Sequence, residues 1–180
     1  MMKKIFPVLI ATLLINIAGF SQIVLENISL LDNKVTLLAP KGLTQMTEEM
    51  VAVKYPDHAN KPNWVLTDEE GKVNLAYSYT KTEIDDNGIP GFTDELITQL
   101  KANRKDIKFI DDGILLQDGK NIGYIKFISQ AKDQKIFNYF FYINLDNRLL
   151  LFNFNCINKW RKKWETSADE IANSIRVKVE

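Results

Sequence analysis

Four apolar stretches in the second half of the chain, separated by very short polar turns, constrain the fold more than any other feature. The stretches cover residues 109–117, 122–131, 135–145 and 149–157. The connections between them are Asp118-Gly119, Lys132-Asp133-Gln134 and Asp146-Asn147, all typical turn sequences. Strands joined by so few residues run antiparallel. The sequence therefore predicts a four-stranded antiparallel meander.

The last two of these strands are apolar on both faces. Phe137, Tyr139 and Phe141 alternate with Phe140 and Tyr142, and residues 149–154 repeat the pattern. A strand with two apolar faces has to be covered on both sides. Two segments with a 3-4 spacing of apolar residues, 92–103 and about 159–175, are expected to be the covering helices.

The remaining segments predict shorter elements around this sheet. Over residues 27–39 we expect a strand pair that turns at Asp32-Asn33, or one bent strand, and after it a short helix capped by Thr47 and ended by Pro56. Strands are expected from Trp64 and from Val73, followed by a long loop over residues 85–91. Thr93 is expected to cap the next helix, and Val177 and Val179 to add a short closing strand. The predicted fold class is α+β, with a mainly antiparallel β-sheet sandwiched between helices.

Residues 1–21 have the layout of a secretory signal peptide. Lys3 and Lys4 precede an apolar run from 5 to 18, and Gly19 and Ser21 suit a cut before Gln22. The run is shorter than the roughly 20 residues of a membrane-spanning helix, although an uncleaved anchor and a buried helix stay open as alternatives. With no cysteine near the cut to carry a lipid, we expect a periplasmic or secreted protein with no stable membrane span. Residues 22–180 are expected to form a single domain.

Charge disfavours nucleic acid as a partner. The chain has 23 Lys and Arg against 23 Asp and Glu, and the leader contributes Lys3 and Lys4 to the positive side. A chain that is near neutral or slightly acidic has no global field to attract phosphate backbones.

Motifs for catalysis or metal binding are sparse. Cys156 is the only cysteine, and its strand-like surroundings favour a buried apolar role over an intermolecular disulfide or a reactive thiol. His58 is the only histidine and lies in a polar loop, so a zinc site or a Ser-His-Asp triad has little support. The segment from Asp85 to Gly88 lacks the spacing of an EF-hand loop. We therefore predict no cofactor, no metal and no catalytic residues.

One basic and aromatic cluster is the candidate interaction patch. It consists of Trp160, Arg161, Lys162 and Lys163. Such clusters can bind anionic membranes or nucleic acid. Because Trp160 and Trp164 share a helical face, the alternative is a core-facing pair of tryptophans beside a solvated basic surface.

The chain resembles the PsbP-like superfamily, which includes the Mog and DcrB-like proteins. The resemblance rests on the segment Val35-Thr36-Leu37-Leu38-Ala39-Pro40-Lys41-Gly42-Leu43, on the helix over 92–103, on the meander from Gly123 to Cys156, and on the last helix from Trp164 to Ile175. It implies an α/β/α sandwich around an antiparallel sheet. It also implies non-enzymatic roles, such as assembly factors, adaptors, extrinsic subunits or chaperones. No functional residues carry over, because the family shares no catalytic set.

These observations favour an exported binding or adaptor module without catalysis. The partner is expected to be a protein of the cell envelope, with a small apolar ligand as the second choice, bound at a sheet edge or between sheet and helix. The alternative is a small envelope hydrolase or metal-dependent enzyme built from His58, Asp85, Asp86 and Asn155, whose side chains would then have to converge. A third hypothesis is an envelope-surface protein that uses Arg161, Lys162 and Lys163.

Overall fold

The computed structural model describes residues 23–56 and 61–178. Within them, seven strands form one antiparallel sheet in the order β3-β4-β5-β9-β8-β7-β6. These strands are β3 (Thr44–Gln45), β4 (Trp64–Thr67), β5 (Val73–Glu83), β6 (Lys108–Gln117), β7 (Lys120–Gln130), β8 (Lys135–Leu145) and β9 (Arg148–Ile157). The predicted meander is confirmed as β6 to β9, and β5 adds to its far side by pairing with β9.

A hairpin and the end of the chain form a second, smaller sheet. Within the described residues it has the order β1-β2-β10, with β1 (Leu25–Leu30), β2 (Val35–Pro40) and β10 (Arg176–Val177). Asp32 and Asn33 have positive φ in the turn between β1 and β2, as the sequence led us to expect. The predicted closing strand is confirmed at Val177, whereas Val179 lies outside the described residues.

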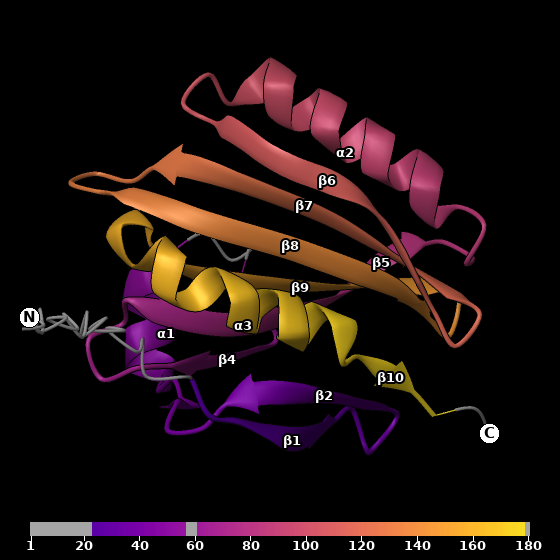
Figure 1. Cartoon of the computed structure of the whole chain (residues 1–180), viewed down its shortest axis with the longest axis horizontal. Coiled ribbons are helices and arrows are strands. Elements are labelled where there is room, and N and C mark those ends of the chain that lie inside the picture. The colour runs from indigo at the N-terminus through magenta and orange to yellow at the C-terminus, as the bar shows by residue number, and fades with distance from the viewer. Residues whose placement is uncertain (1–22, 57–60, 179–180) are drawn as a thin grey trace, which may run out of the picture.

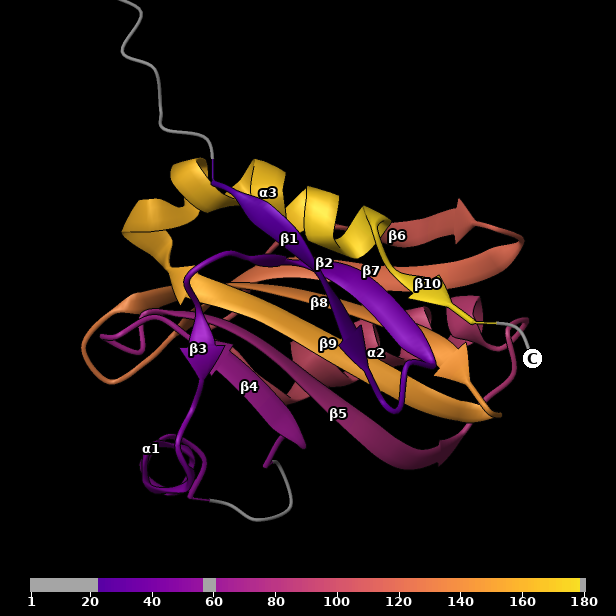
Figure 2. The ribbon, with the colours of Figure 1, turned by 90° about the horizontal axis from the view of Figure 1, so that it is seen from below.

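Both faces of the main sheet are covered, which confirms the α+β sandwich. On one face lies α2 (Ile89–Asn103), and on the other lie α3 (Arg161–Asn173) and the small sheet together (Figures 1 and 2). The helix α1 (Glu48–Lys54) sits beside β3 and β4, and Thr47 caps it by accepting a hydrogen bond from the Met50 amide at 3.3 Å. A short turn of 3₁₀ helix, η2 (Asn158–Trp160), leads from β9 into α3.

The core lies between the sheet and the layer of α3 with the small sheet. Phe141 and Phe152 stack across neighbouring strands with ring centroids 5.1 Å apart, and neither side chain is exposed. Cys156 is fully buried in the same layer, which confirms its apolar role. Burial raises the pKa of the Cys156 thiol to about 12, so the group stays neutral.

The helix α2 begins earlier than predicted. It starts at Ile89 with Pro90 in its first turn, so the expected loop over residues 85–91 ends at Gly88, and Thr93 is no cap. Asp85 turns the chain by accepting a hydrogen bond from the Gly88 amide at 2.7 Å. Thr93 instead lies buried inside the helix, where it accepts a hydrogen bond from the Tyr142 hydroxyl at 2.8 Å. Proline suits a first turn because its missing N–H would have no partner there.

No helix of the described residues is long and apolar enough to cross a membrane.

Candidate binding site

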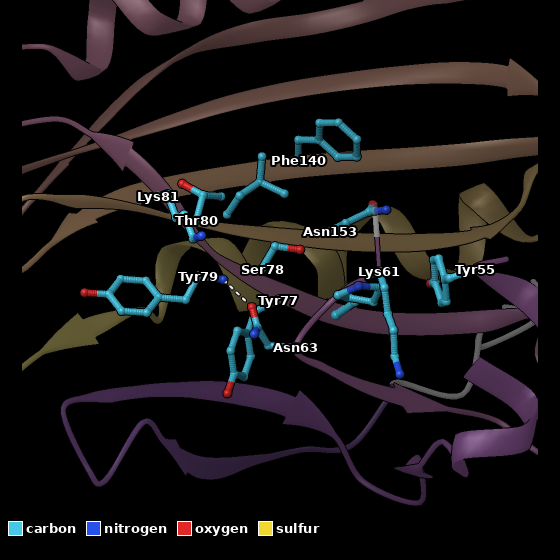
Figure 3. A pocket seen from close by; sticks show the side chains of 13 residues that line it. Tyr55, Lys61, Asn63, Tyr77, Ser78, Tyr79, Thr80, Lys81, Phe140 and Asn153 are labelled. Carbon is cyan, nitrogen blue, oxygen red and sulfur yellow. Dashed lines mark hydrogen bonds between the residues drawn. The ribbon is translucent and has the colours of Figure 1, made fainter. Parts of the chain in front are cut away.

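A trough runs over the face of the main sheet that α2 covers only in part. It consists of two adjoining hollows of about 600 and 940 Å³, which share Tyr55 and Asn153. The side chains of β8, β9 and β5 form its floor, while α1 forms one wall and Arg104, which follows α2, lines the larger hollow. Figure 3 shows the smaller hollow, where Ser78, Thr80 and Asn153 lie on one side of the strands and the Tyr77 ring lies on the other.

A row of asparagines crosses the strands of the floor, and two of its members, Asn138 and Asn155, line the larger hollow. Asn74, Asn155 and Asn138 are direct neighbours across β5, β9 and β8. The Asn74 Nδ2 donates to Asn155 Oδ1 at 2.9 Å, and the Asn138 Nδ2 donates to Ser129 Oγ at 2.9 Å. These amides are at least nine-tenths buried, so the sheet gives up apolar burial at three positions of its centre in order to keep carboxamides there.

Asn74 and Asn153 each have a shielded Oδ1 that accepts no hydrogen bond from any described residue, and of the two only Asn153 lines the trough. It lies on β9 two positions from Asn155, so both side chains project to the same face. Its Oδ1 is shielded from solvent and accepts no hydrogen bond from any described residue. A buried acceptor without a donor costs roughly 1–3 kcal/mol, which a bound ligand with an N–H or O–H group would recover.

The wall formed by α1 exposes apolar surface. Val53 is 84% exposed and Met50 is 37% exposed, and both side chains line the larger hollow. Because Val51 is the only residue of α1 that is buried, most of the apolar surface of this helix is left for the trough and the solvent. Exposed apolar residues at the rim of a hollow indicate a surface that a partner covers.

Comparisons with known proteins identify the fold. No family model and no curated protein matches the sequence. Cyanobacterial PsbP (CyanoP) from Synechocystis sp. PCC 6803 superposes with a TM-score of 0.60 at 15% identity, covering 86% of this chain and 92% of that one. The Ran-binding protein Mog1p of Saccharomyces cerevisiae gives 0.52 at 10% identity over 87% and 96%. LpqN of Mycobacterium tuberculosis, involved in cell envelope biogenesis, gives 0.53 at 10% identity over 87% and 92%.

The chain has the Mog1p/PsbP-like fold. The resemblance drawn from the sequence is therefore confirmed for the architecture. Identities of 10–15% carry the fold alone.

In this PsbP-like structure, the two carboxylates of the enzymatic hypothesis lie apart from Asn155. Asp85 and Asp86 lie beyond the far end of β5, while Asn155 pairs with Asn74 near the start of that strand. Nine residues of β5 separate the two ends, which corresponds to about 30 Å of extended chain. The carboxylate of Asp86 already has a partner, because the backbone N–H of Asn121 donates to both of its oxygens at 3.1 Å. His58 lies outside the described residues, as does the predicted signal peptide over residues 1–21.

No metal-ligand cluster is present in residues 23–56 and 61–178: no three side chains of His, Cys, Asp or Glu come together there.

The candidate patch at the start of α3 has only part of its charge available. Arg161 forms two hydrogen bonds with the Glu165 carboxylate, at 2.9 and 2.8 Å, and its guanidinium lies 5.5 Å from the Phe137 ring centroid. Trp160 is half-buried against the core, so only Lys162 and Lys163 are fully exposed. The patch belongs to the layer of α3, on the face of the sheet opposite to α2, and at its edge the Trp160 ring centroid lies 5.8 Å from the Nζ of Lys72, which lines the larger hollow.

The trough itself was not predicted from the sequence, apart from the general expectation of a site between sheet and helix. One signal was present: Asn138, Asn153 and Asn155 interrupt strands that are otherwise apolar on both faces. Polar residues at such positions mark either a satisfied network or a binding surface.

Proposed function

We propose that this chain is an exported, non-catalytic binding module whose protein partner inserts an extended segment into the trough. The observation that carries the proposal is the shielded, unpartnered Oδ1 of Asn153 in a floor of carboxamides. A carboxamide offers one acceptor and two donors, as a peptide group offers an acceptor and a donor. The floor can therefore pair with the backbone of an extended polypeptide.

Size and surface support a segment of chain over a small molecule. The two hollows together exceed the roughly 300–1,000 Å³ of a pocket for a small ligand. They are open along their length, and the exposed Val53 and Met50 supply apolar contact at one wall. Structural neighbours include a protein named as Ran-binding and one described as involved in cell envelope biogenesis, which agrees with a binding role.

Location is part of the proposal. We place the mature protein in the periplasm or outside the cell, because residues 1–21 have the pattern of a signal peptide. Expression of the full chain, fractionation, and mass measurement of the product test this. A mature protein that begins at Gln22 in the exported fraction is expected, and an uncut cytosolic product would overturn this part.

Crosslinking from inside the trough tests the binding role. A photoreactive amino acid is placed at Ser78 in the trough, and a matched control at Thr166, which is exposed on α3 at the other face. We expect a discrete crosslinked band in cells from Ser78 alone, which Asn153→Leu abolishes. Equal bands from both positions, or a Ser78 band unaffected by Asn153→Leu, would contradict binding in the trough.

A further inference from the structure

Cations without carboxylate partners surround the trough. Lys61 and Lys81 line the smaller hollow and Lys54 lines the larger one. Among the residues that the structure describes, none of these three lysines forms an ion pair. Other lysines do form ion pairs: Lys72, which also lines the larger hollow, binds Glu70, and Lys126, away from the trough, binds Asp169 at 2.6 Å.

The acidic side chains of the trough do not balance these lysines. Glu70 is held by Lys72. Glu49 lies in the first turn of α1, where the backbone and Thr47 lower the pKa of its carboxyl, so it is negatively charged. These two carboxylates stand against five cationic side chains among the described residues that line the two hollows. In the smaller hollow, no described lining residue is acidic. The trough is thus locally positive on a chain whose overall charge is balanced.

We propose that the segment bound in the trough is acidic, with its backbone on the asparagine floor and its carboxylates on Lys61, Lys81 and Lys54. This inference rests on the proposed function, and it adds the chemistry of the partner. Complementary charge at the rim of a groove selects partners and speeds their approach. The amide floor favours a polypeptide over an anionic sugar, because it matches the alternating donors and acceptors of a backbone.

Lys54 supports the inference from a second direction. Its Nζ donates to the Gly71 carbonyl at 2.8 Å, and desolvation at this site lowers its pKa to about 8, while the charge of Asp68 opposes that shift. The charges around it on the neighbouring turn are Asp68, Glu70 and Lys72. A lysine that is poorly compensated in the free protein gains more from an incoming carboxylate than a fully hydrated one does.

Model peptides test the inference. Three fluorescent decapeptides, alternating Ala with Glu, with Gln or with Lys, are titrated with the mature protein, and anisotropy is measured at low and high salt. We expect the Glu peptide to bind tightest, and its affinity to fall at high salt. The double variant Lys61→Gln/Lys81→Gln should weaken the binding of the Glu peptide about tenfold, since each exposed pair of a lysine with a peptide carboxylate contributes modestly. The matched control, Lys162→Gln/Lys163→Gln, removes the same charge from the other face and should leave binding unchanged.

The outcomes separate this inference from the proposed function. If the Gln peptide binds as tightly as the Glu peptide and Asn153→Leu weakens both, the acidic preference is wrong and the trough still binds polypeptide. If the control variant weakens binding as much as the trough variant, or if the Glu peptide fails to bind up to 1 mM, the inference is also overturned. Stronger competition by an oligogalacturonate than by the unlabelled Glu peptide would replace the polypeptide with an anionic glycan.

Discussion

Asn153 combines a cost to stability with a position suited to binding. Its side chain has the same number of heavy atoms as leucine and the same branching at Cγ, and its Oδ1 is shielded without a donor. We expect Asn153→Leu to leave the free energy of unfolding unchanged or raise it by about 1 kcal/mol, because the orphaned acceptor disappears. Urea denaturation measures this. A loss of more than about 1 kcal/mol would mean that the amide serves the fold and not a partner.

Gly123 is required by a close approach between β7 and its neighbours. A Cβ atom there would lie 2.3 Å from the Tyr142 ring and 2.8 Å from Thr93 Oγ1. We expect Gly123→Ala to destabilise the protein by about 1–3 kcal/mol, because the Tyr142–Thr93 hydrogen bond has to break or shift.

The matched control for this change is Gly91→Ala in α2, where a Cβ meets no atom within 4 Å. It should stabilise the protein by up to about 1 kcal/mol, through the lower entropy of the unfolded chain. Thermal denaturation of both variants checks the pair. Similar melting temperatures for the two would contradict the packing at Gly123.

Lys54 gives the proposed binding a pH dependence. Its pKa of about 8 in the free protein should rise when a carboxylate binds beside it. Affinity for an acidic peptide is then constant below pH 8 and falls above it, by up to about tenfold per pH unit, because binding takes up a proton. Titrations between pH 6.5 and 9.5 measure this. Lys54→Gln should flatten the profile in this range, and a profile that keeps its slope would point to another group.

At the scale of the elements, a buried cation joins α3 to the sheet in addition to the apolar contacts of the helix. Lys126 on β7 is 8% exposed, and its Nζ lies 2.6 Å from Asp169 on α3 and 4.9 Å from the Tyr139 ring centroid. Asp111 on β6 is a more distant partner at 3.9 Å. The two halves of the pair differ in exposure, since the Asp169 side chain is 40% exposed and the Lys126 side chain 10%.

This difference in exposure predicts that substituting Asp169 and substituting Lys126 lower the free energy of unfolding by different amounts. Asp169→Ala leaves a buried ammonium without its main partner and should cost about 1–3 kcal/mol, less than a fully buried pair. Lys126→Met keeps the apolar stem and leaves a carboxylate that water can reach, so it should cost under about 1 kcal/mol. Urea denaturation of both variants measures these costs. A larger cost for Lys126→Met than for Asp169→Ala would contradict this description of the contact.

Elements were predictable from the sequence where the signal was local. The turn pairs Asp118-Gly119 and Asp146-Asn147 predicted the meander, and the apolar stripe of α3 predicted which face of that helix is buried. The start of α2 was missed because Thr93 looks like a cap, while its hydroxyl is used by Tyr142, 49 residues away. The separate small sheet was missed because β2 pairs with β10, which is a contact between the two ends of the chain.

At the scale of the whole molecule, the trough depends on contacts that no local pattern reveals. Its floor comes from β5, β8 and β9 and one wall from α1, so it exists only once distant segments are assembled. Asn138, Asn153 and Asn155 are recognisable in the sequence as polar interruptions of apolar strands. Their neighbours in the sheet are not recognisable, because the pairing of β5 with β9 spans most of the second half of the chain.

Stability should be distributed unevenly over this architecture. Strand β9 is hydrogen-bonded on both sides along its length, whereas α1 has seven residues and buries only Val51. In native-state hydrogen exchange, we expect the amides of β8 and β9 to open only with global unfolding. Those of α1 should open locally, at a free energy several kcal/mol lower. Equal protection in α1 and β9 would show that the trough wall is as rigid as its floor.

The pairing of β5 with β9 also limits how early the protein can complete its fold. Strand β5 pairs with β9, which ends at Ile157, and the small sheet is completed only when β10 (Arg176–Val177) joins the β1–β2 hairpin, so neither sheet is complete before almost the whole chain is available. Long loops must close before these pairings repay their entropy, so such a topology folds slowly. A chain that cannot complete its sheets until its last residues are present also stays unfolded for longer. The export that we propose would require this unfolded state for passage through a narrow translocation channel.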